Sequence, residues 1–215
     1  MSEQPFRDRN QAGKLLANQL SHYSGQEDVL VLALPRGGVP VAIEVARALG
    51  VSMDIFIVRK LGVPGREELA MGAIASGDVR VVNDRVAASL RVDERTIAQV
   101  LVREEQELKR REHTYRGDRP APNIEGRTVI LIDDGLATGS TMRAAIIGVR
   151  AHHPAKLVVG VPVAASEICT EIGTEVDEVV CLRQPTTLLG IGGWYEDFSQ
   201  LSDEEVKALL EEFGR

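Results

Sequence analysis

The stretch from Val129 to Thr141, VILIDDGLATGST, constrains the fold of this chain more than any other. It begins with four aliphatic residues, three of them β-branched, and such a run is typical of a buried strand in a parallel sheet. Two adjacent carboxylates follow, and a loop of small and hydroxylated residues then leads into a second apolar pattern. The stretch therefore predicts a strand, an acid pair, a loop and a helix, in that order.

The loop itself predicts an anion site. Residues 138–141, TGST, would turn into the helix, whose unpaired N–H groups and positive dipole end favour a negative charge. Gly139 would let the backbone come close to a bound group. The hydroxyl side chains can donate to phosphate oxygens, and we expect one of them to cap the helix.

The acid pair, Asp133 and Asp134, indicates a different partner, because two carboxylates would repel a phosphate. Vicinal ribose hydroxyls or a divalent cation are natural partners for such a pair. The alternative is an acid pair at a strand end that only binds nearby backbone N–H groups.

The whole stretch resembles the motif for phosphoribosyl pyrophosphate (PRPP) of the type I phosphoribosyltransferases: four aliphatic residues, an acid pair, then T-G-x-T. The resemblance implies that Asp133 and Asp134 hold the ribose 2- and 3-hydroxyls of PRPP. Its 5-phosphate would be cradled by the loop residues Ala137, Thr138, Gly139, Ser140 and Thr141. Gly135 departs from the family, because an aliphatic residue is common there. Ala137 also departs, because the 6-oxopurine salvage branch carries an aspartate at this position.

A second motif, PRGG at residues 35–38, lies between a predicted strand over 29–34 and a predicted helix that ends at Gly50. Paired glycines can present N–H groups as an anion nest, and Arg36 adds a fixed cation. The alternative is a tight turn with a surface arginine. The motif is similar to the pyrophosphate loop of the same family. That similarity implies that Arg36, Gly37 and Gly38 contact the diphosphate, with a cis peptide between Pro35 and Arg36.

Composition places the chain among ordinary globular proteins. Its 215 residues suit one domain, and they are 44% hydrophobic and 27% charged. A net charge of -7 argues against a nucleic-acid or membrane-surface role. Cys169 and Cys181 are the only cysteines, and we expect reduced core thiols in a cytoplasmic protein.

Strands and helices alternate along the chain, which predicts an α/β fold with a doubly wound, mainly parallel sheet. We expect a single domain over 1–215, with a core of about 26–185 and a small hood built from the terminal segments 1–25 and 186–215. The remaining elements are expected as helices at 8–22, 93–115, 140–151 and 163–171, strands at 54–58, 129–132, 156–161 and 177–182, and a last helix from a capping box at Ser202 to Phe213.

The segment after the strand at 54–58 resembles the mobile flap of the family, and short strands are expected within 69–75 and 79–82. Arg59 and Lys60 begin this segment, and they either reach the diphosphate or form a solvated basic pair. Glu67 and Glu68 are expected to be surface acids.

The long helix at 93–115 carries arginines interleaved with glutamates, which favours a solvated face over a nucleic-acid site. It either projects from the core or packs along one edge, where it offers a surface for a homodimer contact.

The hood is where the resemblance ends. Trp194 stands beside a run of glycines, and it either stacks on a nucleobase or packs in an apolar core. For Tyr195 and Phe198 we favour the core. The family's base-reading lysine has no counterpart here, because the stretch GVPVAASE has Ala164 and Ala165 instead. This absence argues against guanine or hypoxanthine as the acceptor.

The resemblance implies transfer of the phosphoribosyl group of PRPP to a nucleobase-like nitrogen, with Mg²⁺ as cofactor and release of diphosphate. Arg36, Asp133 and Asp134 would be the catalytic residues, and the two aspartates would contact Mg²⁺ through water or through the ribose. Two alternatives remain: a PRPP-sensing regulator without turnover, and an unrelated phosphosugar enzyme.

Overall fold

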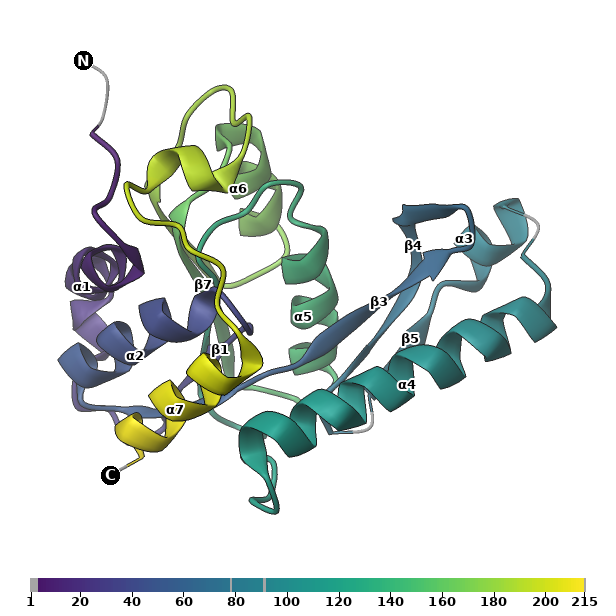
Figure 1. Ribbon diagram of the computed structural model, residues 1–215, viewed down its shortest axis with the longest axis horizontal. Coiled ribbons are helices and arrows are strands. Elements are labelled where there is room, and N and C mark those ends of the chain that lie inside the picture. Colours follow the sequence, from purple (N-terminus) through teal and green to yellow (C-terminus); the bar gives the residue numbers. More distant parts are fainter. Residues whose placement is uncertain (1–3, 78, 91, 215) are drawn as a thin grey trace.

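The computed structural model describes residues 4–77, 79–90 and 92–214, and its centre is a five-stranded parallel sheet (Figure 1). The strand order is β2-β1-β6-β7-β8. The strands are β1 (Val29–Ala33), β2 (Ser52–Ile55), β6 (Thr128–Ile132), β7 (Lys156–Val163) and β8 (Glu178–Arg183). The sheet confirms the predicted doubly wound α/β fold, and it brings the carboxyl ends of β1 and β6 side by side.

Helices cover both faces of this sheet because alternate strand residues point to opposite sides. Val31 and Ile130 pack on the side of α1 (Arg9–Gln19) and α2 (Gly38–Leu49). Leu30 and Leu131 pack on the opposite side, where α5 (Ser140–Arg150) and α6 (Ser166–Gly173) lie. The last helix, α7 (Asp203–Phe213), packs against α2 and α4 (Glu94–Arg116).

An arm projects from the parallel sheet, on the right in Figure 1. It consists of the antiparallel strands β3 (Val58–Val63), β4 (Arg66–Ala75) and β5 (Val79–Val82), together with α3 (Asp84–Ser89) and α4 (Glu94–Arg116). The strand expected at 54–58 is in fact two strands in different sheets, and α3 was not predicted. The side chains of Glu67 and Glu68 lie outside the described part of the chain.

Side-chain caps begin the helices α1 and α7. The side chain of Asp8 accepts a hydrogen bond from the N–H of Gln11 at the start of α1, at 2.7 Å. Ser202 and Glu205 form the predicted capping box of α7. The helix expected at 8–22 is shorter than predicted, because α1 ends at Gln19 and a 3-10 turn, η1 (Ser21–Tyr23), follows.

Two segments, one from each terminal region, meet over the carboxyl ends of the strands. Phe6 pairs with Tyr195, and the N–H of Phe6 donates to the carbonyl of Trp194 at 2.8 Å. This contact lies just after the 3-10 turn η2 (Ile191–Trp194). The covering part is thus built from residues 4–8 and 191–199, whereas α1 and α7 pack against the core.

The structure corrects the expectation for the cysteines. Cys169 on α6 and Cys181 on β8 form a disulfide, because this helix packs directly on this strand. The predicted pair of reduced thiols is therefore wrong.

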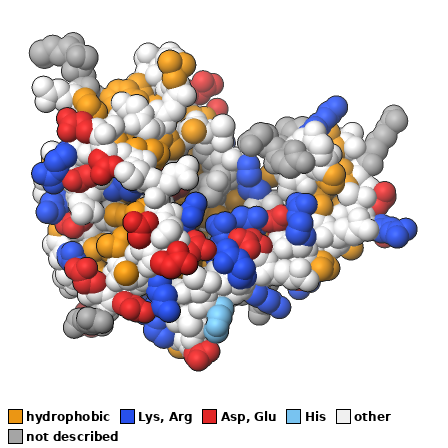
Figure 2. Space-filling model, in the orientation of Figure 1, with side chains coloured by type: hydrophobic (Ala, Val, Ile, Leu, Met, Phe, Trp, Pro, Cys, Tyr) orange, Lys and Arg blue, Asp and Glu red, His pale blue; other side chains and the backbone are white. Residues whose placement is uncertain are grey.

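Charged side chains of both signs lie along α4, and some of them contact an acid of α7. Arg110 and Arg111 both bind Glu107, and Arg110 also lies 3.4 Å from Asp203 of α7. Figure 2 shows acidic and basic side chains interleaved over this face, in agreement with the predicted solvated face. None of the described helices is both long enough and apolar enough to span a membrane.

Candidate functional site

The acid pair stands at the carboxyl end of β6, the central strand of the parallel sheet. All five residues of β6 are buried, so the strand fixes the position of the residues that follow. Asp133 is half-buried, and its Oδ1 accepts the N–H of Asp134 at 2.9 Å. Asp134 is only 9% exposed. The two neighbouring acids therefore differ in environment: Asp133 is the more open, and Asp134 faces the protein.

The PRGG turn packs directly against this pair. A β-carbon built on Gly37 would lie 1.9 Å from Oδ2 of Asp134. One built on Gly38 would lie 3.0 Å from the Cα of Asp133. Only glycine leaves room for this contact, so the two motifs predicted from the sequence form one site. The peptide between Pro35 and Arg36 is cis, as predicted.

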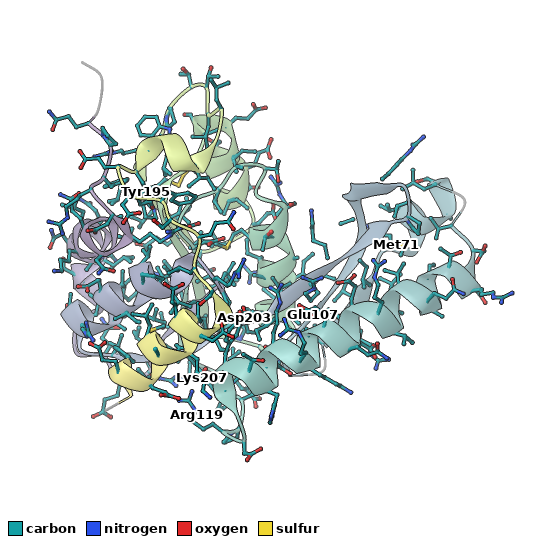
Figure 3. The ribbon with its side chains drawn as sticks, in the orientation of Figure 1. Met71, Glu107, Arg119, Tyr195, Asp203 and Lys207 are labelled. Atoms are coloured by element: carbon teal, nitrogen blue, oxygen red, sulfur yellow. A yellow bond between two sulfur atoms is a disulfide. The ribbon has the colours of Figure 1, made fainter. Side chains whose placement is uncertain are left out.

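Arg36 extends from this turn and is the more accessible part of it. Its side chain is 44% exposed, and Nη1 lies 3.9 Å from Oδ1 of Asp203 at the start of α7. Figure 3 shows Asp203 beside Glu107, the acid of α4 that shares Arg110 with it. The guanidinium of Arg36 therefore makes one long contact with Asp203 and stays largely accessible beside the acid pair.

The loop after the acid pair lines a cavity of about 180 Å³. Residues 133–142 form most of its wall, and Ile191 also lines it. Ile191 belongs to residues 191–199, here called the covering segment. Gly139 has φ 71° and is the N-cap of α5, so the helix begins without the predicted hydroxyl cap. Thr138 instead accepts the N–H of Ser140 at 3.4 Å, and its carbonyl binds Arg143. The helix N-terminus faces the cavity without a side-chain cap, which suits an anion.

Arg59 and Lys60 have different surroundings, because neighbouring residues of a strand point to opposite faces. Nζ of Lys60 lies 3.3 Å from Oγ of Ser140 and so joins the arm to the loop. Arg59 binds Glu104 of α4, with its Nη2 2.6 Å from Oε2. A diphosphate contact by Arg59 would require it to leave this acid, and of the two residues only Lys60 contacts the loop in this structure.

The aromatic residues of the covering segment lie mainly in a small apolar cluster. Tyr195 is buried there with Phe6, as favoured from the sequence, and its hydroxyl donates to the carbonyl of Asp134 at 2.6 Å. Trp194 is half-buried and packs against the same cluster. It is not among the residues that line the cavity, where Ile191 takes that place.

Burial raises the pKa of Asp133 well above its ordinary value, and the charge of Asp134 adds to this effect. Burial also raises the pKa of Asp134, although Arg9 acts in the opposite direction. Two acids that are costly to ionise are suited to partners that donate hydrogen bonds or bring positive charge.

Comparison with known proteins settles the family. The profile of the phosphoribosyl transferase domain matches residues 8–183. The chain belongs to the phosphoribosyl transferase family. It is 43% identical over 210 residues to proteins from two strains of Mycobacterium tuberculosis whose names assign them provisionally to the phosphoribosyl transferases. The match covers 98% of this chain but 47% of those relatives, so the chain spans about half of their length.

Two solved structures are similar to this chain. The crystal structure of TT1426 from Thermus thermophilus matches with a TM-score of 0.87 and 41% identity, over 97% of this chain and 99% of that one. The AQ2163 protein from Aquifex aeolicus matches with a TM-score of 0.50 and 14% identity, over 81% and 73% of the two chains. This second likeness concerns the fold alone.

Phosphoribosyl transferases of this type usually use Mg²⁺ with PRPP. Within the described part of the chain, no three His, Cys, Asp or Glu side chains are arranged to hold a metal ion. The pair of carboxylates at the cavity still fits Mg²⁺, which commonly binds one or two carboxylates together with substrate phosphates and water. Asp133 and Asp134 are the carboxylates at the cavity that would supply such contacts.

Arg9 is a residue of this candidate site that the sequence analysis missed. It lies on α1, 125 residues from Asp134, and its Nε donates to Oδ2 of that acid at 2.9 Å. No local pattern around residue 9 indicates the contact, because it depends on how α1 packs across the end of the sheet. A buried acid predicted at a strand end could have prompted a search for its cation.

Proposed function

We propose that the protein transfers the 5-phosphoribosyl group of PRPP to a nitrogen of a nucleobase-like acceptor, with release of diphosphate. The observation that carries this proposal is the direct packing of the PRGG turn on the acid pair, with Gly37 against Asp134. An anion nest, two carboxylates and a helix N-terminus then adjoin one another. PRPP offers a diphosphate, a ribose diol and a phosphate in the same order.

Each part of the substrate has a partner in this proposal. Asp133 and Asp134 accept hydrogen bonds from the ribose hydroxyls. The 5-phosphate occupies the cavity at the N-terminus of α5, in contact with residues 137–141. The diphosphate lies against Arg36 and the N–H groups of Gly37 and Gly38, with Lys60 reaching it from the arm. The acceptor enters below the covering segment, near Ile191 and Trp194.

In the reaction, the bond between C1 of the ribose and the diphosphate oxygen breaks, and its electron pair leaves with the diphosphate. The acceptor nitrogen gives its lone pair to C1 from the opposite face, and its proton passes to water. Arg36 and the glycine N–H groups stabilise the charge on the leaving oxygens, while the aspartates hold the sugar in place. When bound, Mg²⁺ supplies further positive charge beside the diphosphate.

The acceptor differs from the bases of the 6-oxopurine branch in this proposal. Ala164 is buried, pairs with Leu136, and stands where that branch has its base-reading lysine. An acceptor without a carbonyl to be read at this position fits such a site better. The same absence is the reason to keep a PRPP-sensing protein without turnover as the second candidate.

The test is diphosphate release from PRPP with Mg²⁺ across a panel of purines, pyrimidines and other nitrogen heterocycles. Release that depends on one acceptor supports the transferase. Calorimetric binding of PRPP without release for any acceptor supports the sensing protein. A chain that does not bind PRPP would contradict both candidates.

A further inference from the structure

The guanidinium of Arg9 makes a nearly dry ion pair with Asp134. Nε lies 2.9 Å from Oδ2, and each side chain is only 12% exposed. Two charges withdrawn from water in this way need good geometry to offset their lost hydration. Arginine is suited to such a pair, because its planar group is weakly hydrated and carries several N–H donors in fixed directions.

The same guanidinium also holds the covering segment. Nη1 donates to the carbonyl of Ser199 at 2.9 Å. Its central carbon lies 4.0 Å from the centre of the Phe198 ring, a cation–π contact. Phe198 in turn stacks on Tyr195, with ring centres 5.0 Å apart. The hydroxyl of Tyr195 returns to the carbonyl of Asp134, so these contacts form a closed circuit.

This circuit runs from the acids to the part of the molecule that covers the cavity. Figure 3 shows Tyr195 on the C-terminal segment, and Arg9 of α1 lies 6.0 Å from the centre of its ring. Ile191, a few residues earlier in that segment, lines the cavity beside the acid pair. A ligand that hydrogen-bonds to Asp134 would compete with Arg9 for the carboxylate. Any movement of Arg9 would then be transmitted to Ser199 and Phe198.

We propose that Arg9 is a positioning residue that orients Asp134 for the ribose and couples ribose binding to the covering segment, residues 191–199. The inference rests on the proposed function, because it takes the ligand of Asp134 to be the sugar of PRPP. It adds a specific role for α1: this helix carries Arg9, whose guanidinium connects the proposed sugar site at Asp134 to the covering segment.

The only tryptophan of the chain provides the readout. Trp194 lies inside the covering segment, and its carbonyl accepts the N–H of Phe6 at 2.8 Å. Titration of the wild-type chain with PRPP and Mg²⁺ is expected to change the Trp194 emission. Arg9→Gln is expected to lower PRPP affinity by about tenfold and to abolish the emission change. Lys14→Gln, a control on the same helix whose side chain is 66% exposed, should behave as the wild type.

Arg9→Lys separates positioning from a loss of folding. A lysine keeps the charge beside Asp134, but a single ammonium cannot serve the acid, the Ser199 carbonyl and the Phe198 ring together. PRPP affinity should stay within about threefold of the wild type while the emission change is lost. This variant decides the question if Arg9→Gln does not fold, as judged by circular dichroism.

The outcomes distinguish this inference from the proposed function. A wild-type chain that does not bind PRPP overturns both. A wild-type chain that binds PRPP, with Arg9→Gln equal to it in affinity and in emission change, overturns the role of Arg9 alone. A loss of affinity in Arg9→Gln with the emission change retained overturns the coupling.

Discussion

The carboxylate of Asp134 occupies the space that a side chain on Gly37 would need, since a β-carbon built there falls 1.9 Å from Oδ2. The backbone of Gly37 has φ -63° and ψ -31°, which any residue can adopt. The requirement for glycine is therefore steric rather than conformational. The acid pair and the PRGG turn cannot change independently.

Gly37→Ala should destabilise the fold by about 1–3 kcal/mol and weaken PRPP binding, because Asp134 must move away from the new methyl group. The free energy of unfolding, measured in urea, should fall much less when the same change is made in an Asp134→Ala background. Gly214→Ala is the matched control, because a β-carbon there meets nothing closer than 3.5 Å. Equal costs of Gly37→Ala in both backgrounds would contradict the steric account.

Lys60→Met and Arg59→Met should have different effects, on binding and on stability respectively, although the two residues are adjacent. Lys60 reaches Ser140 of the loop, so its loss should weaken binding of diphosphate and PRPP with little change in stability. Loss of Arg59 leaves Glu104, only 6% exposed, with Arg103 as its remaining partner among the described residues, and should destabilise the fold by about 1–3 kcal/mol. Calorimetric titration and urea unfolding of both variants test this; similar effects of the two changes would argue against the alternation.

Asp133→Asn should stabilise the ligand-free protein at pH 7 without Mg²⁺. Burial and the charge of Asp134 raise the pKa of Asp133 in the folded state, so ionisation costs folding free energy once the pH exceeds the unfolded value. The amide oxygen can still accept the N–H of Asp134. We expect a gain of about 1 kcal/mol at pH 7 that disappears near pH 3. A loss of stability at pH 7 would show that the surroundings of Asp133 do not destabilise its ionised form.

Glu107 should contribute to stability in the opposite pH range. Hydrogen bonds from Arg110 and Arg111 lower the pKa of Glu107 from 4.5 to about 2. Its contribution is therefore present above about pH 4.5 and is lost as the pH falls toward 2. Because Glu107 is 29% exposed, solvent limits the effect to about 1 kcal/mol or less.

In Glu107→Gln, the slope of unfolding free energy between pH 4.5 and 2 should decrease. Glu125→Gln, on the exposed loop before β6, is the control for the change of side chain alone. An unaltered slope in Glu107→Gln would show that the ion pairs of Glu107 do not contribute to stability.

The sequence was sufficient to predict the parts of the site that are local. The aliphatic run of β6, the acids after it and the glycines after β1 are each set by a few neighbouring residues. Parallel pairing of β1 with β6 then brings Gly37 to Asp134, as expected for strands that share a carboxyl edge. The caps at Asp8 and Ser202 follow from side chains three residues from their partners.

The contacts that were missed join elements far apart in the sequence, or involve a strand whose bounds were predicted wrongly. Arg9 reaches Asp134 only through the packing of α1, and Cys169 meets Cys181 only because α6 lies on β8. Arg59 was grouped with Lys60 because the strand was expected to end at 58. Once β3 is seen to run through Val63, period-two alternation separates the two residues.

The central claim is that the acid pair binds the sugar of PRPP, and calorimetric titration with PRPP and Mg²⁺ tests it most directly. Asp28→Asn is the control, because it makes the same change at the other end of the parallel sheet, where Asp28 binds Thr128. We predict that Asp133→Asn lowers PRPP affinity at least about tenfold but leaves inorganic diphosphate affinity nearly unchanged, whereas Asp28→Asn changes neither. Equal PRPP affinity for Asp133→Asn and the wild type would contradict the account.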